Sequence, residues 1–197
     1  SEMLSADFSL FYINRENERR YMADKGDVIN GETLDKDVVG QVGRMDSRGF
    51  DVELTYRPVR GLSFTAGYGY TDARLRKIAT NPYLDGENLV GKRYAYSPLH
   101  SFYVYADYTI REGVLRGLGF NFDVTYQDEV YRNFSNTSTF PSYWMTDASI
   151  SYRLPNRVRL RLNVNNVFNT DYYNQALGSQ YVPGMPRNFL ISAAYSL

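Results

Sequence analysis

At 197 residues, with 22 basic and 22 acidic side chains, the chain has the length of one ordinary domain and no net charge. This balance gives no reason to expect nucleic acid as a partner, and the lack of cysteine excludes disulfides and thiolate chemistry. The mean hydropathy is −0.46, and no stretch approaches the roughly 18 to 20 continuous apolar residues of a membrane-spanning helix. A membrane-spanning strand escapes this test, because only every second side chain meets lipid.

Apolar and polar residues alternate along most of the chain. A weaker segment near Ser5 to Asn14 comes first, followed by 50–56, 62–70, 102–110, 118–126, 148–154, 158–164 and 189–197. In the clearest segment, Leu62, Phe64 and Ala66 alternate with Ser63 and Thr65. A period of two places one set of side chains on each face of a strand, whereas a helix would mix them. The pattern predicts an all-β fold of about eight strands, each of the roughly 9 to 11 residues that cross a bilayer when tilted.

The connections between these segments alternate in length. The short ones are Arg57 to Gly61, Arg111 to Gly117 and Pro155 to Asn156, and the long ones are roughly Arg15 to Gly43, Ala73 to Arg93, Gln127 to Pro141 and Asn166 to Arg187. Brief periplasmic turns and long extracellular loops are typical of transmembrane antiparallel β-barrels of the bacterial outer membrane. We therefore expect the long loops outside the cell and Leu197 at the periplasmic rim.

A soluble β-sandwich would show the same alternation, with the apolar face buried as its core. Sandwich strands are usually shorter, near 5 to 6 residues. Tyrosine placement also favours the membrane, because these amphipathic rings prefer the level of the lipid headgroups. The tyrosines near strand ends on the apolar face are Tyr56, Tyr68, Tyr70, Tyr108, Tyr126, Tyr152 and Tyr195.

The most specific motif lies near the C-terminal end. Residues 162–169 read Leu-Asn-Val-Asn-Asn-Val-Phe-Asn, a Tyr172–Tyr173 pair follows, and residues 183–187 read Pro-Gly-Met-Pro-Arg. This succession resembles the signature of TonB-dependent outer-membrane receptors of the siderophore type. Residues 48–53 and the stretch from Pro141 to Asp147 are similar to that family too, so that the resemblance covers essentially the whole chain.

The resemblance implies a role in transport. It identifies residues 1–197 as the C-terminal segment of a barrel of roughly 22 strands, with the plug domain absent. The expected function is active, TonB-dependent uptake of a ferric siderophore or a similar large nutrient, with no catalysis and no cofactor. The expected partners are the plug and N-terminal strands of the same receptor, the TonB complex acting through the plug, outer-membrane lipid and lipopolysaccharide, and the barrel assembly machinery. The alternative is a complete small eight-stranded outer-membrane barrel with a structural or adhesive role.

Candidate site residues follow from the loops and from the polar strand faces. Aromatic rings stack and guanidinium groups pair with anionic chelates, so the expected ligand contacts are Arg19, Arg20, Tyr21, Tyr83, Tyr131, Arg132, Tyr172, Tyr173 and Tyr181. Such residues also serve as headgroup anchors. The charges expected to face the lumen or the plug are Asp51, Glu53, Asp107, Asp123, Arg159 and Arg161. Tyr195 and Leu197 are the expected membrane-insertion signal, although barrels of this class usually end in an aromatic residue.

No catalytic or metal site is expected. Asp147 lies close to Ser149 and Ser151, but no histidine accompanies them to complete a hydrolase triad. The single histidine, His100, stands at the start of a strand and is interpreted as a rim residue, since one imidazole does not make a zinc site.

Overall fold

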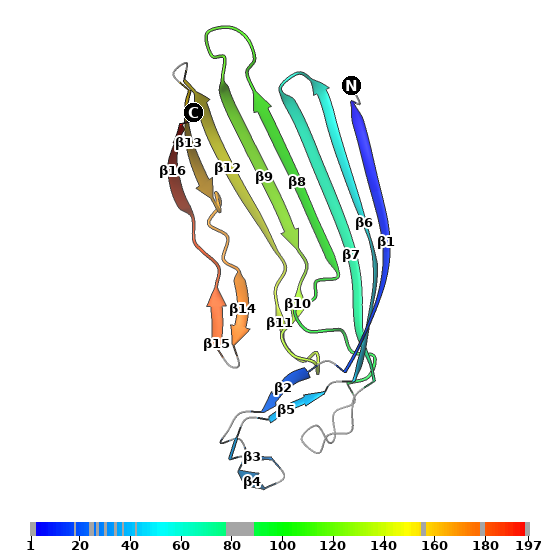
Figure 1. Ribbon diagram of the computed structural model, residues 1–197. Coiled ribbons are helices and arrows are strands. Elements are labelled where there is room, and N and C mark those ends of the chain that lie inside the picture. Colours follow the sequence, from blue (N-terminus) through cyan, green and yellow to red (C-terminus); the bar gives the residue numbers. More distant parts are fainter. Residues whose placement is uncertain are drawn as a thin grey trace.

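The computed structural model consists of strands and their connections (Figure 1). It describes residues 3–17, 19–23, 26, 28–29, 31–33, 35–36, 38–41, 43–77, 89–154, 157–177 and 180–195. Among these described residues there is no helix long and apolar enough to cross a membrane.

Eight long strands form one antiparallel sheet, which confirms the predicted strand number. They are β1 (Leu4–Glu16), β6 (Arg44–Val59), β7 (Leu62–Lys77), β8 (His100–Thr109), β9 (Leu118–Gln127), β12 (Tyr143–Arg153), β13 (Val158–Asn165) and β16 (Asn188–Tyr195). Their spatial order is β1-β6-β7-β8-β9-β12-β13-β16, so every strand pairs with its nearest long neighbours in sequence. Short turns join the strands at the end where the N- and C-termini lie, and the long connections project from the other end (Figure 1).

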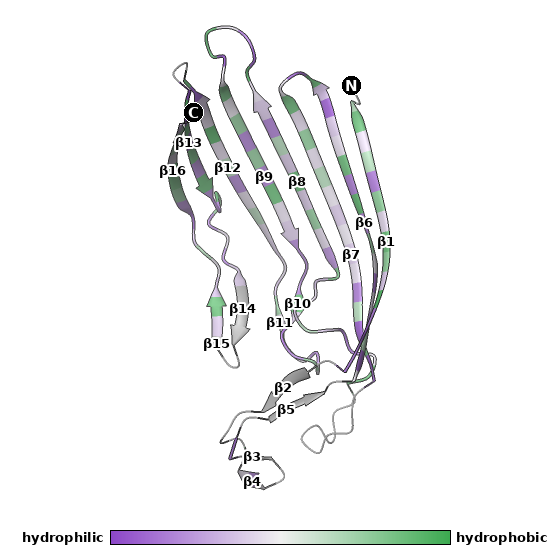
Figure 2. Ribbon diagram, viewed as in Figure 1, coloured by the Kyte–Doolittle hydropathy of each residue, from purple (hydrophilic) through white to green (hydrophobic). Residues whose placement is uncertain are grey.

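The sheet is a single layer with two exposed faces. Hydrophobic and hydrophilic blocks alternate along its strands (Figure 2). The apolar side chains stay open: Leu10 is 72% exposed and Ile191 is 79% exposed. The buried hydrophobic residues are Met45, Ala73, Leu75, Leu89, Ala95, Val130 and Phe140, all near the long-loop end. Because no second sheet covers the apolar face in the described part of the chain, the structure contradicts the soluble sandwich.

The sheet is also open. β1 and β16 are its two edges, and within the described residues they do not pair with each other (Figure 1). The open edges contradict the alternative of a complete small barrel, in which the first and last strands would pair with each other.

The strands run further than predicted at the long-loop end. β7 continues to Lys77, although the alternation placed the start of a loop at Ala73, whereas β6 begins at Arg44, directly after the predicted end of a loop at Gly43. The long connections hold small hairpins: β2 (Arg19–Ala23) with β5 (Val38–Gln41), β3 (Val28–Ile29) with β4 (Glu32–Thr33), β10 (Val130–Tyr131) with β11 (Thr139–Phe140), and β14 (Tyr173–Leu177) with β15 (Gln180–Pro183). The predicted loops are therefore partly regular structure.

A small hydrophobic core closes this end of the sheet. Leu75 is fully buried and packs with Leu89, which is 3% exposed, beside Tyr94 and Phe134. The Leu75 amide donates a hydrogen bond to the Lys92 carbonyl at 3.0 Å, so the chain after residue 89 pairs with the end of β7.

Candidate functional site

The polar face of the sheet carries all six charges that the sequence assigned to the lumen. Residues opposite each other in the register share a face, and the register links Asp51 and Glu53 through β7 and β8 to the remaining strands. The same face continues through Asp107 and Asp123 to Arg159 and Arg161 on β13.

Glycine gives this face its shape at the centre of β7. Gly67 stands between Glu53 and Tyr103, and the Tyr103 ring lies over it so that the hydroxyl donates a hydrogen bond to Glu53. A Cβ atom at Gly67 would lie 2.2 Å from the ring, so any larger residue would displace it. Gly67 therefore leaves room for the Tyr103 side chain to extend across β7 and bond to the Glu53 carboxylate.

Two grooves of opposite charge lie along the polar face. The first, of about 610 Å³, is acidic and contains Asp7, Asp51 and Glu53. The second, of about 400 Å³, lies at the short-turn end and is basic. Its charged lining is Asp107, Arg111, Arg116, Arg153, Arg159 and Arg161. Asp123 lies outside both, opposite Asp147 in the register. The face thus presents separate negative and positive surfaces to whatever occupies the space in front of it.

At the long-loop end, Arg132 is held among aromatic rings. Its guanidinium carbon lies 4.4 Å from the centroid of the Tyr181 ring and 5.4 Å from that of Phe140. Phe140 stacks on Tyr173 with centroids 5.0 Å apart and meets Tyr181 edge-on at 5.6 Å. The Arg132 Nε atom is buried and has no hydrogen-bond partner in the described structure. We call Arg132, Phe140, Tyr173 and Tyr181 the loop aromatic cluster.

The C-terminal motif forms a network of hydrogen bonds around Asn166. This residue is 2% exposed and adopts a positive φ of 52°. Its amide donates to Asp147 at 2.7 Å, and its side chain donates to the carbonyls of Thr170 and Met185. Its side-chain oxygen also accepts the Thr170 amide at 2.7 Å.

A second asparagine joins the two halves of the motif. Asn169 accepts the Arg187 amide at 2.9 Å, and the Arg187 guanidinium donates to the Val167 carbonyl at 3.2 Å. The Asn-Val-Phe-Asn turn and the Pro-Gly-Met-Pro-Arg segment therefore form one structural unit.

The sequence matches a known family over most of its length. The family described as TonB dependent receptor-like, beta-barrel, matches residues 1–167. The chain belongs to this TonB-dependent receptor family. Members of the family are transport receptors of the bacterial outer membrane and not enzymes, in agreement with the expected class and localisation.

The chain matches only part of the length of each individual relative. The metal-pseudopaline receptor CntO of Pseudomonas aeruginosa is 29% identical over 171 residues, which are 85% of this chain and 23% of CntO. The catecholate siderophore receptor Fiu of Escherichia coli is 26% identical over 169 residues, or 82% of this chain and 21% of Fiu. The chain thus spans about a quarter of the length of the curated relatives it matches.

A solved structure shares the fold. The siderophore receptor PiuA from Acinetobacter baumannii superposes with a TM-score of 0.72 at 24% identity, covering 97% of this chain and 26% of PiuA. The eight-stranded sheet of this TonB-dependent receptor is therefore a fold found in barrels of known structure.

The remaining predicted contacts of the receptor are dispersed. Tyr172 stacks on Tyr143 with centroids 4.8 Å apart, and the Arg93 guanidinium lies 5.5 Å from the centre of the Tyr131 ring. Arg19, Arg20 and Tyr21 lie in β2, where the structure describes the backbone only, and Tyr83 lies outside the described residues. Of the expected insertion signal, Tyr195 pairs with Val158 in the receptor sheet, and Leu197 lies outside the described part.

Sequence reasoning missed Phe140, the ring around which the loop aromatic cluster of the receptor is built. The only available signal was its position in a long aromatic loop, directly before Pro141. Tyr143 was assigned to the family resemblance and not to a contact with Tyr172.

Proposed function

We propose that residues 1–197 form the C-terminal part of the barrel of a TonB-dependent receptor that takes up a ferric siderophore or a similar large nutrient. The observation that carries this proposal is an open sheet, apolar on one face and polar on the other, in a chain of this family. Unpaired strand edges are not tolerated in lipid, so further strands of the same receptor complete the barrel at β1 and β16.

The two grooves support a plug within the barrel. A folded plug domain in front of the polar face meets an acidic surface at Asp51 and Glu53 and a basic one at Arg159 and Arg161. Complementary charges on the plug would fix its orientation. The energy of uptake then reaches the plug through the TonB complex, and the barrel supplies the wall against which the plug moves.

The loop aromatic cluster is the best-formed candidate for ligand contact. A guanidinium stacked on rings keeps its charge and presents donors in a fixed plane, which suits anionic chelates with aromatic or carboxylate groups. Arg19, Arg20, Tyr21, Tyr83, Tyr131 and Tyr172 remain further proposed contacts from the other loops.

Uptake of radioactive iron by cells that express the full-length receptor tests the proposal. The probes are ferrioxamine B, a ferric catecholate and the metal complex of pseudopaline, each with and without a functional TonB. We expect TonB-dependent uptake of at least one probe. Uptake that is the same without TonB, or none above cells lacking the receptor, contradicts the proposal.

A substitution locates the contact. Arg132→Ala removes the stacked guanidinium, so we expect the apparent affinity for the transported chelate to fall about tenfold, as for loss of one charged hydrogen bond. Arg60→Ala, in the short turn between β6 and β7, removes the same charge at the opposite rim and is the matched control. Equal affinities in both variants would exclude Arg132 from the ligand site.

A further inference from the structure

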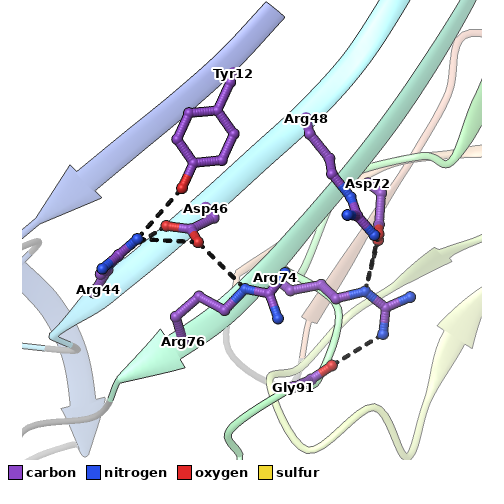
Figure 3. Close-up of polar contacts among 8 residues, drawn as sticks. All are labelled: Tyr12, Arg44, Asp46, Arg48, Asp72, Arg74, Arg76 and Gly91. Carbon is purple, nitrogen blue, oxygen red and sulfur yellow. Dashed lines mark hydrogen bonds and ion pairs between the residues drawn. The ribbon is translucent and has the colours of Figure 1, made fainter.

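Four arginines and two aspartates of β6 and β7 lie close together near the long-loop end of these strands (Figure 3). The members of this outer arginine cluster are Arg44, Asp46, Arg48, Asp72, Arg74 and Arg76. None of them was among the residues that the sequence singled out as site candidates.

The register places the cluster on the lipid face of the sheet. Phe50 pairs with Tyr70 in the apolar row, and two residues further along, Arg48 pairs with Asp72. Two more residues along, Asp46 pairs with Arg74. Because side chains two residues apart share a face, these charges point to the same side as Phe50 and Tyr70 and away from the lumen.

The polarity of the two faces reverses at this point. On the side of the short turns, the outward side chains are apolar and the inward ones are polar. On the side of the long loops, the outward side chains of β6 and β7 are charged. Of the inward ones there, Met45, Ala73 and Leu75 are apolar and Ser47 is polar, and all four are buried. Such a reversal is what the change from hydrocarbon to water requires, so it marks the outer boundary of the bilayer.

The distance along the strands agrees with this boundary. The cluster begins two residues beyond Phe50 and Tyr70, at Arg48 and Asp72, which is roughly 7 Å along a strand, or about 5 Å along the normal of a bilayer crossed at about 45°. Its last members, Arg44 and Arg76, lie six residues beyond, but Arg76 reaches back to Asp46, four residues beyond Phe50 and about 9 Å along that normal. The headgroup layer is about 5 to 7 Å deep on each side of the hydrocarbon. An outward arginine costs about 2 to 4 kcal/mol at the midplane but only about 0 to 1 kcal/mol near the interface.

The aspartates hold the guanidinium groups in place. Asp72, whose side chain is 3% exposed, accepts Arg74 Nε at 2.8 Å and lies 3.3 Å from an amino group of Arg48. Asp46 lies 2.9 Å from Arg44 Nε and 3.4 Å from Arg76 Nε.

Ionisation of Asp46 is favoured at this level, which lies beyond the membrane-spanning part of β6. The hydrogen bond from Arg44 lowers the pKa of the Asp46 carboxyl below its ordinary value. Two carboxylates therefore face four permanent positive charges. Glu16 and Lys77, both paired with Arg44, add one charge of each sign, so the excess remains positive.

We propose that the outer arginine cluster binds the phosphate of a lipid headgroup in the outer leaflet. Arg48 is a principal contact because its side chain is 64% exposed. Arg76 is the other: it is 40% exposed, as Arg44 is, but Arg44 also donates to Tyr12 and Arg74 also donates to the Gly91 carbonyl. Among the described residues each of the two makes a single ion pair. Guanidinium forks match phosphate oxygens in pairs, and arginines that the protein already orients lose less entropy when they bind.

The test uses the full-length receptor in micelles and measures retained lipid by native mass spectrometry. The probes are bisphosphorylated lipid A and the same lipid after enzymatic removal of its phosphates. We expect the intact receptor to prefer the phosphorylated form and the variant Arg48→Gln/Arg76→Gln to bind it at least about tenfold more weakly. The control Arg57→Gln/Arg60→Gln removes the same charge at the short-turn end, from two exposed residues outside the basic groove, and should bind like the unaltered receptor.

Several results would overturn the proposal. Equal retention of both lipids by the unaltered receptor excludes phosphate recognition, and equal weakening in the control reduces the effect to net charge. Displacement of lipid A by inorganic phosphate at equal concentration excludes the lipid as the source of the phosphate.

Heat-dependent electrophoretic mobility reports whether each variant is folded. If the glutamine variant does not fold, Arg48→Lys/Arg76→Lys replaces it and should bind with intermediate strength, since it keeps the charge but loses the fork. Lipid retention is independent of iron uptake, so failure here leaves the proposed function standing.

Discussion

Asn166 shows at the level of one residue why the C-terminal motif needs asparagine. Its short amide reaches two carbonyls and one amide while its backbone holds a positive φ, a conformation that asparagine tolerates better than most residues. Glutamine would not fit the same distances, and alanine would leave buried partners unsatisfied.

We therefore expect Asn166→Ala to lower the free energy of unfolding by about 2 to 4 kcal/mol, the sum of several lost buried hydrogen bonds. Urea titration of the full-length receptor in lipid vesicles, followed by tyrosine and tryptophan fluorescence, measures this change. Asn163→Ala is the control, because Asn163 is only half-buried and its side chain makes one long hydrogen bond at 3.4 Å, and its effect should stay within about 0.5 kcal/mol. Equal losses in the two variants would remove the special role of the turn.

At the level of the element, each long strand alternates between the apolar and the polar face of the sheet, residue by residue. β9 is the clearest case, since Phe120, Phe122 and Val124 lie on the apolar face and Asn121 and Asp123 on the polar face, which we propose lines the lumen. The chain has no cysteine of its own, so single cysteines introduced along β9 report on their own positions.

We expect a water-soluble maleimide to label cysteines at positions 121 and 123 and to leave those at 120, 122 and 124 unlabelled, because hydrocarbon excludes the charged reagent. Labelling is measured by mass spectrometry of the full-length receptor in vesicles after removal of the plug. Uniform labelling along the strand would contradict the assignment of the two faces.

Alternation predicted the eight strands and their faces because two different environments impose a period of two on the sequence. The same rule misplaced the end of β7, since Asp72 and Arg74 are polar on the side that the rule reserves for apolar residues. It was equally silent on the loop aromatic cluster. Arg132 and Tyr181 come from separate loops without periodicity, and only their folded hairpins bring them to Phe140.

For the whole molecule, the open edges of the sheet determine what this chain can do alone. β1 and β16 each present unpaired backbone groups along one side, and such groups cost several kcal/mol each in hydrocarbon. Within the described residues, β1 pairs only with β6 and β16 only with β13, so neither has a partner on its outer side.

We expect residues 1–197 expressed alone not to insert into lipid vesicles as a folded barrel. Electrophoresis with and without heating checks this, because closed barrels migrate faster before heating, and the full-length receptor is the positive control. A heat-sensitive compact band from the isolated chain would mean that the sheet can close on itself, against the pairing seen here.

We place the small core around Leu75 and Leu89 beyond the lipid, whereas in the described part of the chain no second protein layer covers the apolar rows that we assign to the lipid. The effect of shortening an apolar side chain of β7 therefore depends on where along the strand the side chain lies. Where acyl chains surround it, a shortened side chain leaves no hole, because a fluid flows in to replace the missing methyl groups. Where loops surround it, the neighbours are tethered and cannot follow, so the same truncation leaves an empty space that the protein has to carry.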